Sequence, residues 1–263
     1  MSTRNWTSQP HGDRDRELAA RIERELPALL ALATRLTGDP DDAHGAVQDT
    51  LERAWRARTQ LRDPAAAGGW LRSILARRVI DRRRGRRDLP AGGATELDDL
   101  LLPNIDDPAS IVASAQDEGA VRAALRTLAT DDRVAVVLHD GENWTAAEVA
   151  ELLGIGPEAA HKRIQRARAK LVAALAAPQA VSAPTGDCVL VRGQAHDLLD
   201  ETLDAANRAR LQTHLDSCPH CPAALQAAAG VLGSLHSPGH PQPLTESLRE
   251  RLRALVAEGE ATT

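Results

Sequence analysis

The chain has 263 residues and a formal net charge of −5, and its apolar residues, 43% of the total, include neither Phe nor Tyr. A core of Ala, Leu and Val without aromatic strand formers argues against a β-rich fold and predicts an all-α protein of two or three small domains. No apolar run reaches the roughly 18 residues of a bilayer span, and the N-terminus lacks the apolar core of a signal peptide, so we expect a cytoplasmic protein without a membrane segment.

Three helices are predicted in the first domain, residues 15–88. The first runs from about residue 16 to residue 37 and ends at Gly38-Asp39-Pro40. The second and third have apolar stripes at helical spacing over about 41–58 and 70–84.

Charge is unevenly distributed along the chain. Residues 72–87 contain eight Arg and a single acid, whereas residues 88–120 contain eight acids and no Lys, Arg or His. Blocks of opposite sign indicate distinct roles, although a solvated basic helix end beside an acidic linker fits the same charges. We assign residues 89–117 to an acidic linker.

The first domain contains the stretches D-P-D-D-A-H-G-A-V-Q-D-T-L-E-R-A-W and G-W-L-R-S-I-L-A-R-R-V-I-D-R-R-R. In these stretches it resembles region 2 of the extracytoplasmic-function type of RNA polymerase sigma factors, in the sigma-70 family. The resemblance implies that the first stretch docks on the polymerase core through Asp42, His44, Gln48 and Asp49. It implies that the second contacts the −10 promoter element, and the basic side chains expected there are Arg77, Arg82, Arg83 and Arg84.

The sequence departs from the family pattern at His44-Gly45, where Glu-Asp is usual. That acidic pair helps to bind the polymerase clamp in the family. Its replacement favours a second interpretation, a zinc-dependent helix-turn-helix regulatory protein that recruits no polymerase. Gly45 also destabilises its helix by roughly 1 kcal/mol relative to Ala.

Residues 118–177 contain the pattern of a helix-turn-helix. Thr145 caps a helix that ends at Gly154, and Pro157 suits the first position of the next helix. Donors on this second helix would contact phosphates and bases in a DNA groove, with Arg168 among them. The residues expected to bind DNA are His161, Lys162, Arg163 and Arg166. A helical hairpin with a solvated basic face would give the same pattern.

Residues 121–175 resemble sigma region 4, including the stretches L-R-T-L-A-T-D-D-R-V-A-V-V-L and R-A-R-A-K-L. The resemblance implies recognition of the −35 promoter element. Gly156 stands where a capping Ser is common, and Glu158-Ala159-Ala160 stands where Gly-Thr-Val is typical. These departures indicate an unusual promoter element rather than a different fold.

All three cysteines lie in the last third of the chain, within a module assigned to residues 186–236. His214, Cys218 and Cys221 form an H-x3-C-x2-C arrangement, and Cys188 precedes it by 26 residues. Three Cys and one His make a closed tetrahedral set typical of one structural zinc ion. Free thiols that fall together by chance are the alternative, and a Cys218–Cys221 redox pair is compatible with zinc.

The module from Cys188 to Leu225 resembles the zinc-binding anti-sigma domain. An amphipathic helix is predicted after it, over residues 243–258, with one apolar face formed by Leu244, Leu248, Leu252, Leu255 and Val256. In the resembling domains a helix beside the zinc site packs on the sigma regions and blocks polymerase. We therefore expect residues 186–263 to contact regions 2 and 4 and to regulate them in cis, in a direction that the sequence does not fix.

The sequence lacks the signatures H-E-x-x-H, G-x-S-x-G and G-x-x-x-x-G-K, and it has no Gly-rich dinucleotide fingerprint. We therefore expect no enzymatic activity. The resemblances imply RNA polymerase core and promoter DNA as partners, and they leave open a separate anti-sigma partner.

Overall fold

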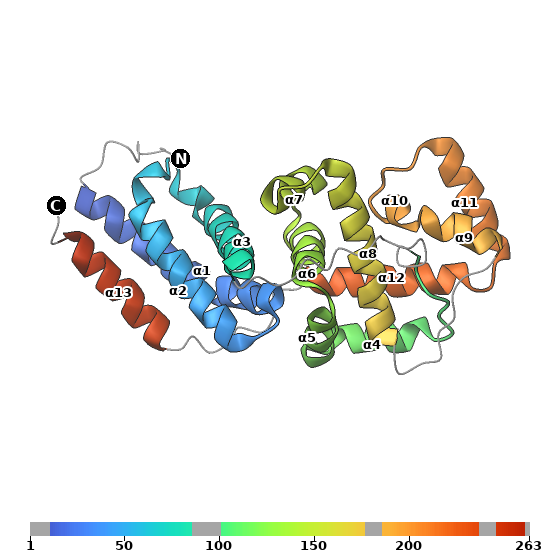
Figure 1. The fold of residues 1–263 in the computed structure, drawn as a ribbon, viewed down its shortest axis with the longest axis horizontal. Helices are drawn as coiled ribbons and strands as arrows, with labels where there is room; N and C mark the ends of the chain where they lie inside the picture. Colours follow the sequence, from blue (N-terminus) through green and yellow to red (C-terminus); the bar gives the residue numbers. More distant parts are fainter. Residues whose placement is uncertain (1–10, 86–100, 177–185, 237–245, 261–263) are drawn as a thin grey trace, which may run out of the picture. The chain divides into compact units, whose positions relative to one another are not determined.

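The computed structural model describes residues 11–85, 101–176, 186–236 and 246–260. Every regular element within these ranges is a helix, which confirms the all-α prediction (Figure 1). The chain divides into two compact units, one formed by Met1–Asp88 with Pro238–Thr263 and the other by Leu89–Ser237. Among the helices described, none combines the length and the apolar character that a bilayer span requires.

The first unit brings the N-terminal helices together with the last helix of the chain. Its elements are α1 (His11–Thr37), α2 (Pro40–Arg56), the 3-10 turns Arg58–Gln60 and Pro64–Ala66, α3 (Ala67–Gly85) and α13 (Glu246–Glu260). The predicted stop after α1 is confirmed, since Gly38 has a φ of 76° and the Asp39 side chain accepts from the first backbone N–H groups of α2. Fully buried leucines and isoleucines, among them Ile22, Leu51 and Leu71, form the core between α1, α2 and α3.

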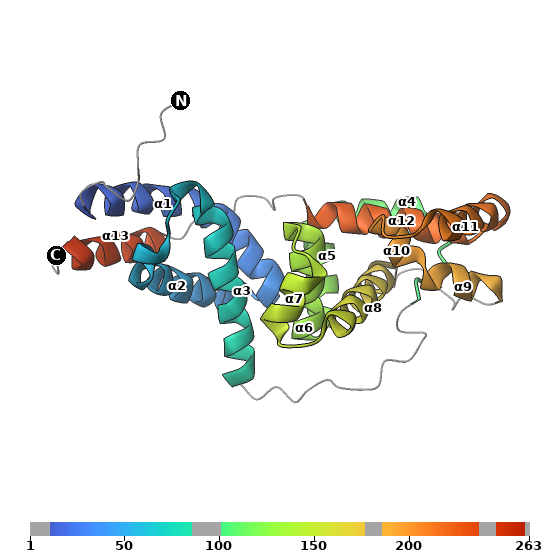
Figure 2. The same ribbon diagram turned by 90° about the horizontal axis from the view of Figure 1, so that it is seen from above.

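Helix α13 packs along α1 and α2 in both views (Figures 1 and 2). Leu248, Leu252 and Leu255 are buried there, so most of the predicted apolar face is covered by the first unit. Leu244 lies outside the described residues.

The second unit combines the helix-turn-helix with the cysteine-containing module. Its elements are α4 (Pro108–Gln116), α5 (Glu118–Thr127), α6 (Thr130–Val136), the π-helical turn Val137–Gly141, α7 (Ala146–Leu153), α8 (Pro157–Ala176), α9 (Asp187–Gly193), α10 (Ala195–Leu199), α11 (Ala205–Ser217) and α12 (Cys221–Leu235). Helix α8 packs against α5, α6 and α7, while α12 packs against α4, α8 and the π-helical turn. The module therefore shares a core with the helix-turn-helix.

The linker predicted over residues 89–117 was wrong for its second half. The part of the predicted linker from residue 101 onward is folded, with Leu102, Ile105 and Ile111 buried and α4 packed on α12. Helix α4 lies very close to α12, because a Cβ added at Gly230 of α12 would lie 2.5 Å from a methyl group of Val112 of α4. In the cysteine-containing module, α9 and α10 are two short helices that meet at Gln194.

Candidate nucleic-acid interface and metal centre

The turn between α7 and α8 has the local chemistry of a helix-turn-helix. Thr145 accepts from the backbone N–H of Glu148, and the Glu148 carboxylate accepts from the N–H of Thr145, so a capping box begins α7. Gly154 ends α7 in the left-handed region, with a φ of 69°. Helix α8 then begins at Pro157, as predicted.

The donors predicted on α8 do not share one exposed face. Lys162 is exposed, whereas Arg163 donates to Asp132 over 2.9 Å and Arg166 donates to the same carboxylate over 3.0 Å. Asp132 is a buried residue of α6. The Nε2 atom of His161 lies 3.2 Å from the Asp197 carboxylate of α10. Two of the predicted DNA contacts are thus held by α6 and a third faces the cysteine-containing module.

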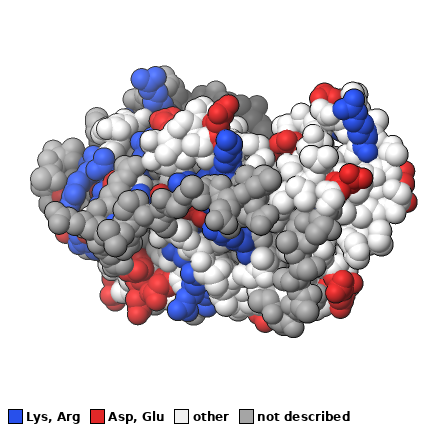
Figure 3. Space-filling model, turned by 45° about the vertical axis from the view of Figure 1, so that its right-hand side comes forward, with Lys and Arg blue, Asp and Glu red and all other residues white. Residues whose placement is uncertain are grey.

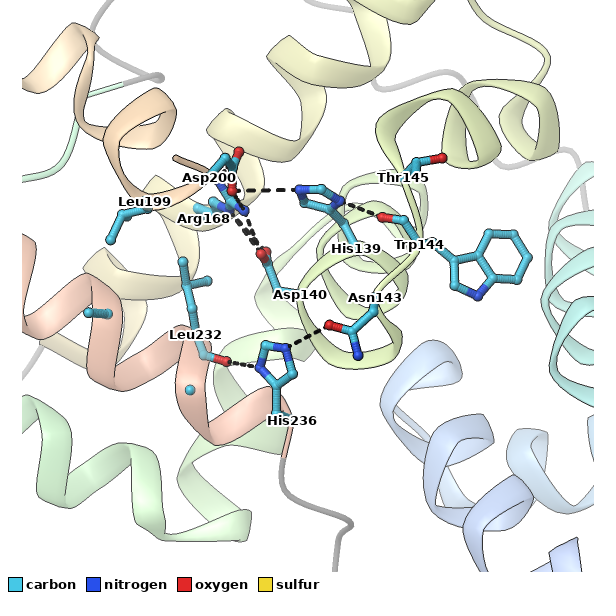
Figure 4. Close-up of a pocket in the computed structure, with 12 residues that line it drawn as sticks. His139, Asp140, Asn143, Trp144, Thr145, Arg168, Leu199, Asp200, Leu232 and His236 are labelled. Carbon is cyan, nitrogen blue, oxygen red and sulfur yellow. Dashed lines mark hydrogen bonds and ion pairs between the residues drawn. The ribbon is translucent and has the colours of Figure 1, made fainter. Parts of the chain in front are cut away.

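Arg168 was expected to point toward DNA, and that expectation was wrong. Its side chain is 2% exposed and forms ion pairs with Asp140 of the π-helical turn and with Asp200, the residue after α10. Figure 4 shows both carboxylates converging on the guanidinium, with His139 beside Asp200. Bidentate arginine–carboxylate pairs are among the strongest ion pairs, so this cluster holds the module against α8.

His139 completes the cluster around Arg168. Its Nδ1–H donates to the Trp144 carbonyl over 2.6 Å, and its Nε2 lies 3.8 Å from Asp200. Burial alone would lower the pKa of His139, but Asp200 and the Trp144 carbonyl outweigh it and raise that pKa. Burial likewise disfavours the Asp200 carboxylate, yet its contacts with His139 and Arg168 hold its pKa below the ordinary value. A pocket of about 530 Å³ opens beside these groups.

On the face drawn in Figure 3, Lys and Arg side chains lie among Asp and Glu side chains and uncharged areas. The visible surface therefore presents no continuous basic patch among the residues that the structure describes.

The four predicted metal ligands meet at one point. The ligand atoms of Cys188, His214, Cys218 and Cys221 all lie within 4.8 Å of one another. The Cys188 sulfur is 3.6 Å from the Cys218 sulfur and 3.8 Å from Nε2 of His214. A tetrahedral zinc ion with ordinary bond lengths separates its ligand atoms by about 3.6–3.8 Å. The Cys/His cluster is therefore compatible with zinc binding.

The protonation of the thiols also fits a site that holds a cation. Burial and the neighbouring thiols raise the pKa of Cys188 to about 12. Burial opposes ionisation of Cys218, but the backbone N–H groups of Cys221 and His220 outweigh it and lower the pKa of Cys218 to about 6. Three sulfurs this close can all be thiolates only around a positive ion.

Helix α2 carries the residues predicted to bind polymerase, and the other helices of the first unit contact them. Asp49 accepts from Arg82 of α3 over 3.0 Å, and the Asp42 carbonyl accepts from the same arginine over 3.5 Å. His44 forms a hydrogen bond of 3.2 Å with Ser247 of α13, and Gln48 is half-buried. The predicted residues thus divide between a side that faces α3 and a side that faces α13.

Two further contacts extend this arrangement. Arg251 of α13 donates to Glu52 of α2 over 2.6 Å, nearer to the C-terminal end of both helices than the hydrogen bond between Ser247 and His44. A Cβ at Gly45 would lie 3.0 Å from the Arg82 guanidinium, so the glycine leaves room for Arg82 to reach Asp49.

The basic residues predicted to bind DNA from α3 also differ in exposure. Arg77 is exposed, Arg83 is half-buried and Arg82 is paired with Asp49. The side chain of Arg84 lies outside the described residues.

Sequence reasoning missed Asp132, Asp140, Asp200 and Arg192, each of which pairs with a residue of another segment of the chain. Helical periodicity marks the buried face of each helix but does not state which helix covers it. The one sequence signal for Asp132 is its place in the acidic stretch T-D-D-R, because acidic residues can form ion pairs with the basic residues of α8.

Family models match three segments of the chain. "Sigma-70 region 2" matches residues 21–88, "Sigma-70, region 4" matches residues 118–171, and "Putative zinc-finger" matches residues 188–221. The order and positions agree with the three resemblances described above.

Among curated proteins, the chain is 31% identical over 188 residues to the ECF RNA polymerase sigma factor SigG of Mycobacterium tuberculosis, covering 64% of this chain and 51% of SigG. It is 32% identical over 155 residues to SigM of the same species, covering 59% of this chain and 74% of SigM. The chain thus spans about half the length of SigG and about three quarters of SigM.

A solved structure, the sigma factor RpoE in complex with the anti-sigma factor NepR from Bartonella quintana, matches with a TM-score of 0.42 and 26% identity. The match covers 59% of this chain and 94% of that chain. At this TM-score the likeness carries no argument about how the present helices are arranged.

Proposed function

The chain belongs to the extracytoplasmic-function family of RNA polymerase sigma factors, and from this premise we propose that it directs promoter recognition and transcription initiation. Its first domain would bind polymerase core and the −10 element, and its helix-turn-helix would bind the −35 element. The observation that carries the proposal is the pair of sigma-region matches in the order that the family has. Because its proposed partners are polymerase core and promoter DNA, the proposed place of action is the bacterial cytoplasm.

Lys162 is the donor that we assign to DNA first, because it is exposed on the second turn of α8. Arg163 and Arg166 would contribute to DNA binding only after their guanidinium groups leave Asp132 and contact the DNA instead. On α3 the exposed residue is Arg77, and Arg82 would have to leave Asp49. The structure described here therefore corresponds to a form in which much of the DNA-binding charge is internally neutralised.

We further propose that the C-terminal part restrains the sigma regions in cis. Helix α13 lies on the face of α2 that includes His44 and Glu52, next to the residues assigned to polymerase. The module holds region 4 through Asp197 and Asp200. The contact of α13 supports inhibition rather than assistance, because α13 and polymerase would compete for one face of α2.

One structural zinc ion is proposed at Cys188, His214, Cys218 and Cys221. These residues come from α9, α11, the turn after α11 and the start of α12, so the ion would hold the module together. With every position filled by protein ligands, it would supply structural cross-linking rather than catalysis.

A zinc-dependent helix-turn-helix regulator that recruits no polymerase remains the second candidate, since His44-Gly45 replaces the acidic pair of the family. A pull-down of polymerase core with the full chain and with the Leu252→Asp variant separates the two. Retention of core by either protein supports the sigma factor. Promoter-sized DNA bound without core retention by either protein supports the regulator.

A further inference from the structure

Arg192 of α9 is a buried cation that joins three parts of the second unit. Its side chain is 1% exposed. Nε lies 3.4 Å from the Cys221 sulfur, Nη1 donates to the Leu102 carbonyl over 2.8 Å, and Nη2 donates to the Asn104 side chain over 2.7 Å. One guanidinium thus touches a metal ligand and the segment that leads into the helix-turn-helix domain.

Charge explains why an arginine is stable in this position. Within the described part of the chain, no carboxylate forms an ion pair with Arg192. A zinc ion with three thiolates and one neutral histidine carries a net charge of about −1. The buried guanidinium matches that charge, and it meets the cluster at the sulfur of Cys221, which is fully buried. Outer contacts of this kind orient metal ligands and strengthen metal binding.

The other end of the contact is the segment Leu101–Ile105, which the sequence alone assigned to a linker. Leu102 and Ile105 are almost completely buried, and the Leu102 carbonyl accepts a hydrogen bond from Arg192 of the module.

We propose that Arg192 is a positioning residue that couples zinc occupancy to the anchoring of residues 101–105. When zinc holds the Cys221 sulfur in place, Arg192 is fixed and so is the segment that it binds. When the ion is lost, the sulfur is no longer held and the negative cluster opposite the guanidinium disappears, so the segment is released.

This inference rests on the proposed zinc module. Thermodynamic linkage makes the coupling between zinc binding and the anchoring of residues 101–105 reciprocal. If zinc stabilises the anchored segment, the anchored segment must strengthen zinc binding by the same factor. Asn104 touches no metal ligand in the described contacts, yet Asn104→Ala should weaken zinc binding, by about 3-fold to 10-fold. Arg192→Met should weaken it by about 10-fold to 100-fold.

The test uses the full chain and measures two quantities: zinc affinity by chelator competition, and hydrogen exchange of peptides covering residues 101–105. Chelation of the unmodified protein should accelerate exchange in this segment, and Arg192→Met should show the faster exchange even when loaded with zinc. Arg210→Met, which removes an exposed arginine of α11, is the matched control and should behave as the unmodified protein. Arg192→Lys keeps the positive charge but loses the branched guanidinium. Its zinc affinity and its exchange rate in residues 101–105 should lie between those of the unmodified protein and of Arg192→Met.

Unchanged exchange of residues 101–105 on chelation, or full protection in zinc-loaded Arg192→Met, would overturn the coupling while leaving the zinc module intact. Failure of the unmodified protein to bind zinc would overturn the module itself and this inference with it. If Arg192→Met does not fold, Arg192→Lys and Asn104→Ala measure the same coupling.

Discussion

Replacement of Leu252 by Asp should release α13 from α2. Leu252 is 4% exposed, and Leu248 and Leu255 flank it on the same face. Full burial of a leucine contributes about 1.5–3 kcal/mol, and a carboxylate in the same place adds a cost for desolvated charge. A total of about 3 kcal/mol shifts the ratio of docked to undocked helix by at least about 100-fold.

The release should appear as tighter binding to polymerase core. The apparent affinity for polymerase core rises by the same factor as the population of chains in which α13 is undocked. The rise ends when α13 is undocked in every chain. The assay is an anisotropy titration of labelled full chain with polymerase core. Ala254→Asp introduces the same carboxylate two residues away on the exposed side of α13, and it should bind core as the unmodified protein does.

Hydrogen exchange of α13 gives the independent check. If α13 exchanges faster in Leu252→Asp but core affinity equals that of the unmodified chain and of Ala254→Asp, then α13 does not compete with polymerase. The assignment of the His44 side of α2 to polymerase would then be refuted.

Further outcomes follow from the two sites in the second unit. Purified protein should contain about one equivalent of zinc, and Cys218→Ser should lose it together with the fold of the module; a metal-free protein of equal stability would contradict this. Lys162→Ala should weaken promoter binding to all sequences alike and reduce the salt slope by about 1, whereas an unchanged slope would exclude a phosphate contact. Because the pKa of His139 is raised by its contacts, this residue stabilises the fold below its ordinary pKa of about 6.5, and the gain disappears as pH rises through the folded pKa. The free energy of unfolding should therefore fall as the pH rises above about 6.5, more steeply than in His139→Gln, and equal slopes in the two proteins would show that His139 does not contribute.

The sequence predicted local features well because their causes are local. The stop at Gly38, the Thr145 cap, the Gly154 end of α7 and the start of α8 at Pro157 each depend on residues within one turn. The cysteine and histidine spacing likewise predicted that Cys188, His214, Cys218 and Cys221 would lie close together, as they do.

Pairing between distant helices could not be predicted in the same way. Arg168 has the spacing of a groove-facing residue, but Asp140 and Asp200 approach it from other elements and bury it. Residues 101–105 read as linker because their neighbours are acidic, although Arg192, some 90 residues later, holds them to the module. A periodic pattern shows which face of a helix is buried, but not which other helix packs on that face. Whether a charged residue is exposed or buried depends on that other helix.

Run-off transcription with reconstituted polymerase core tests the central proposal most directly. The template pool consists of DNA fragments selected by binding to the chain, and the full chain is compared with Leu252→Asp. We predict a discrete transcript that requires the chain and that increases with Leu252→Asp. Absence of any chain-dependent transcript with both proteins, while each still binds the selected DNA, would contradict the proposal that this protein is a promoter-specificity factor.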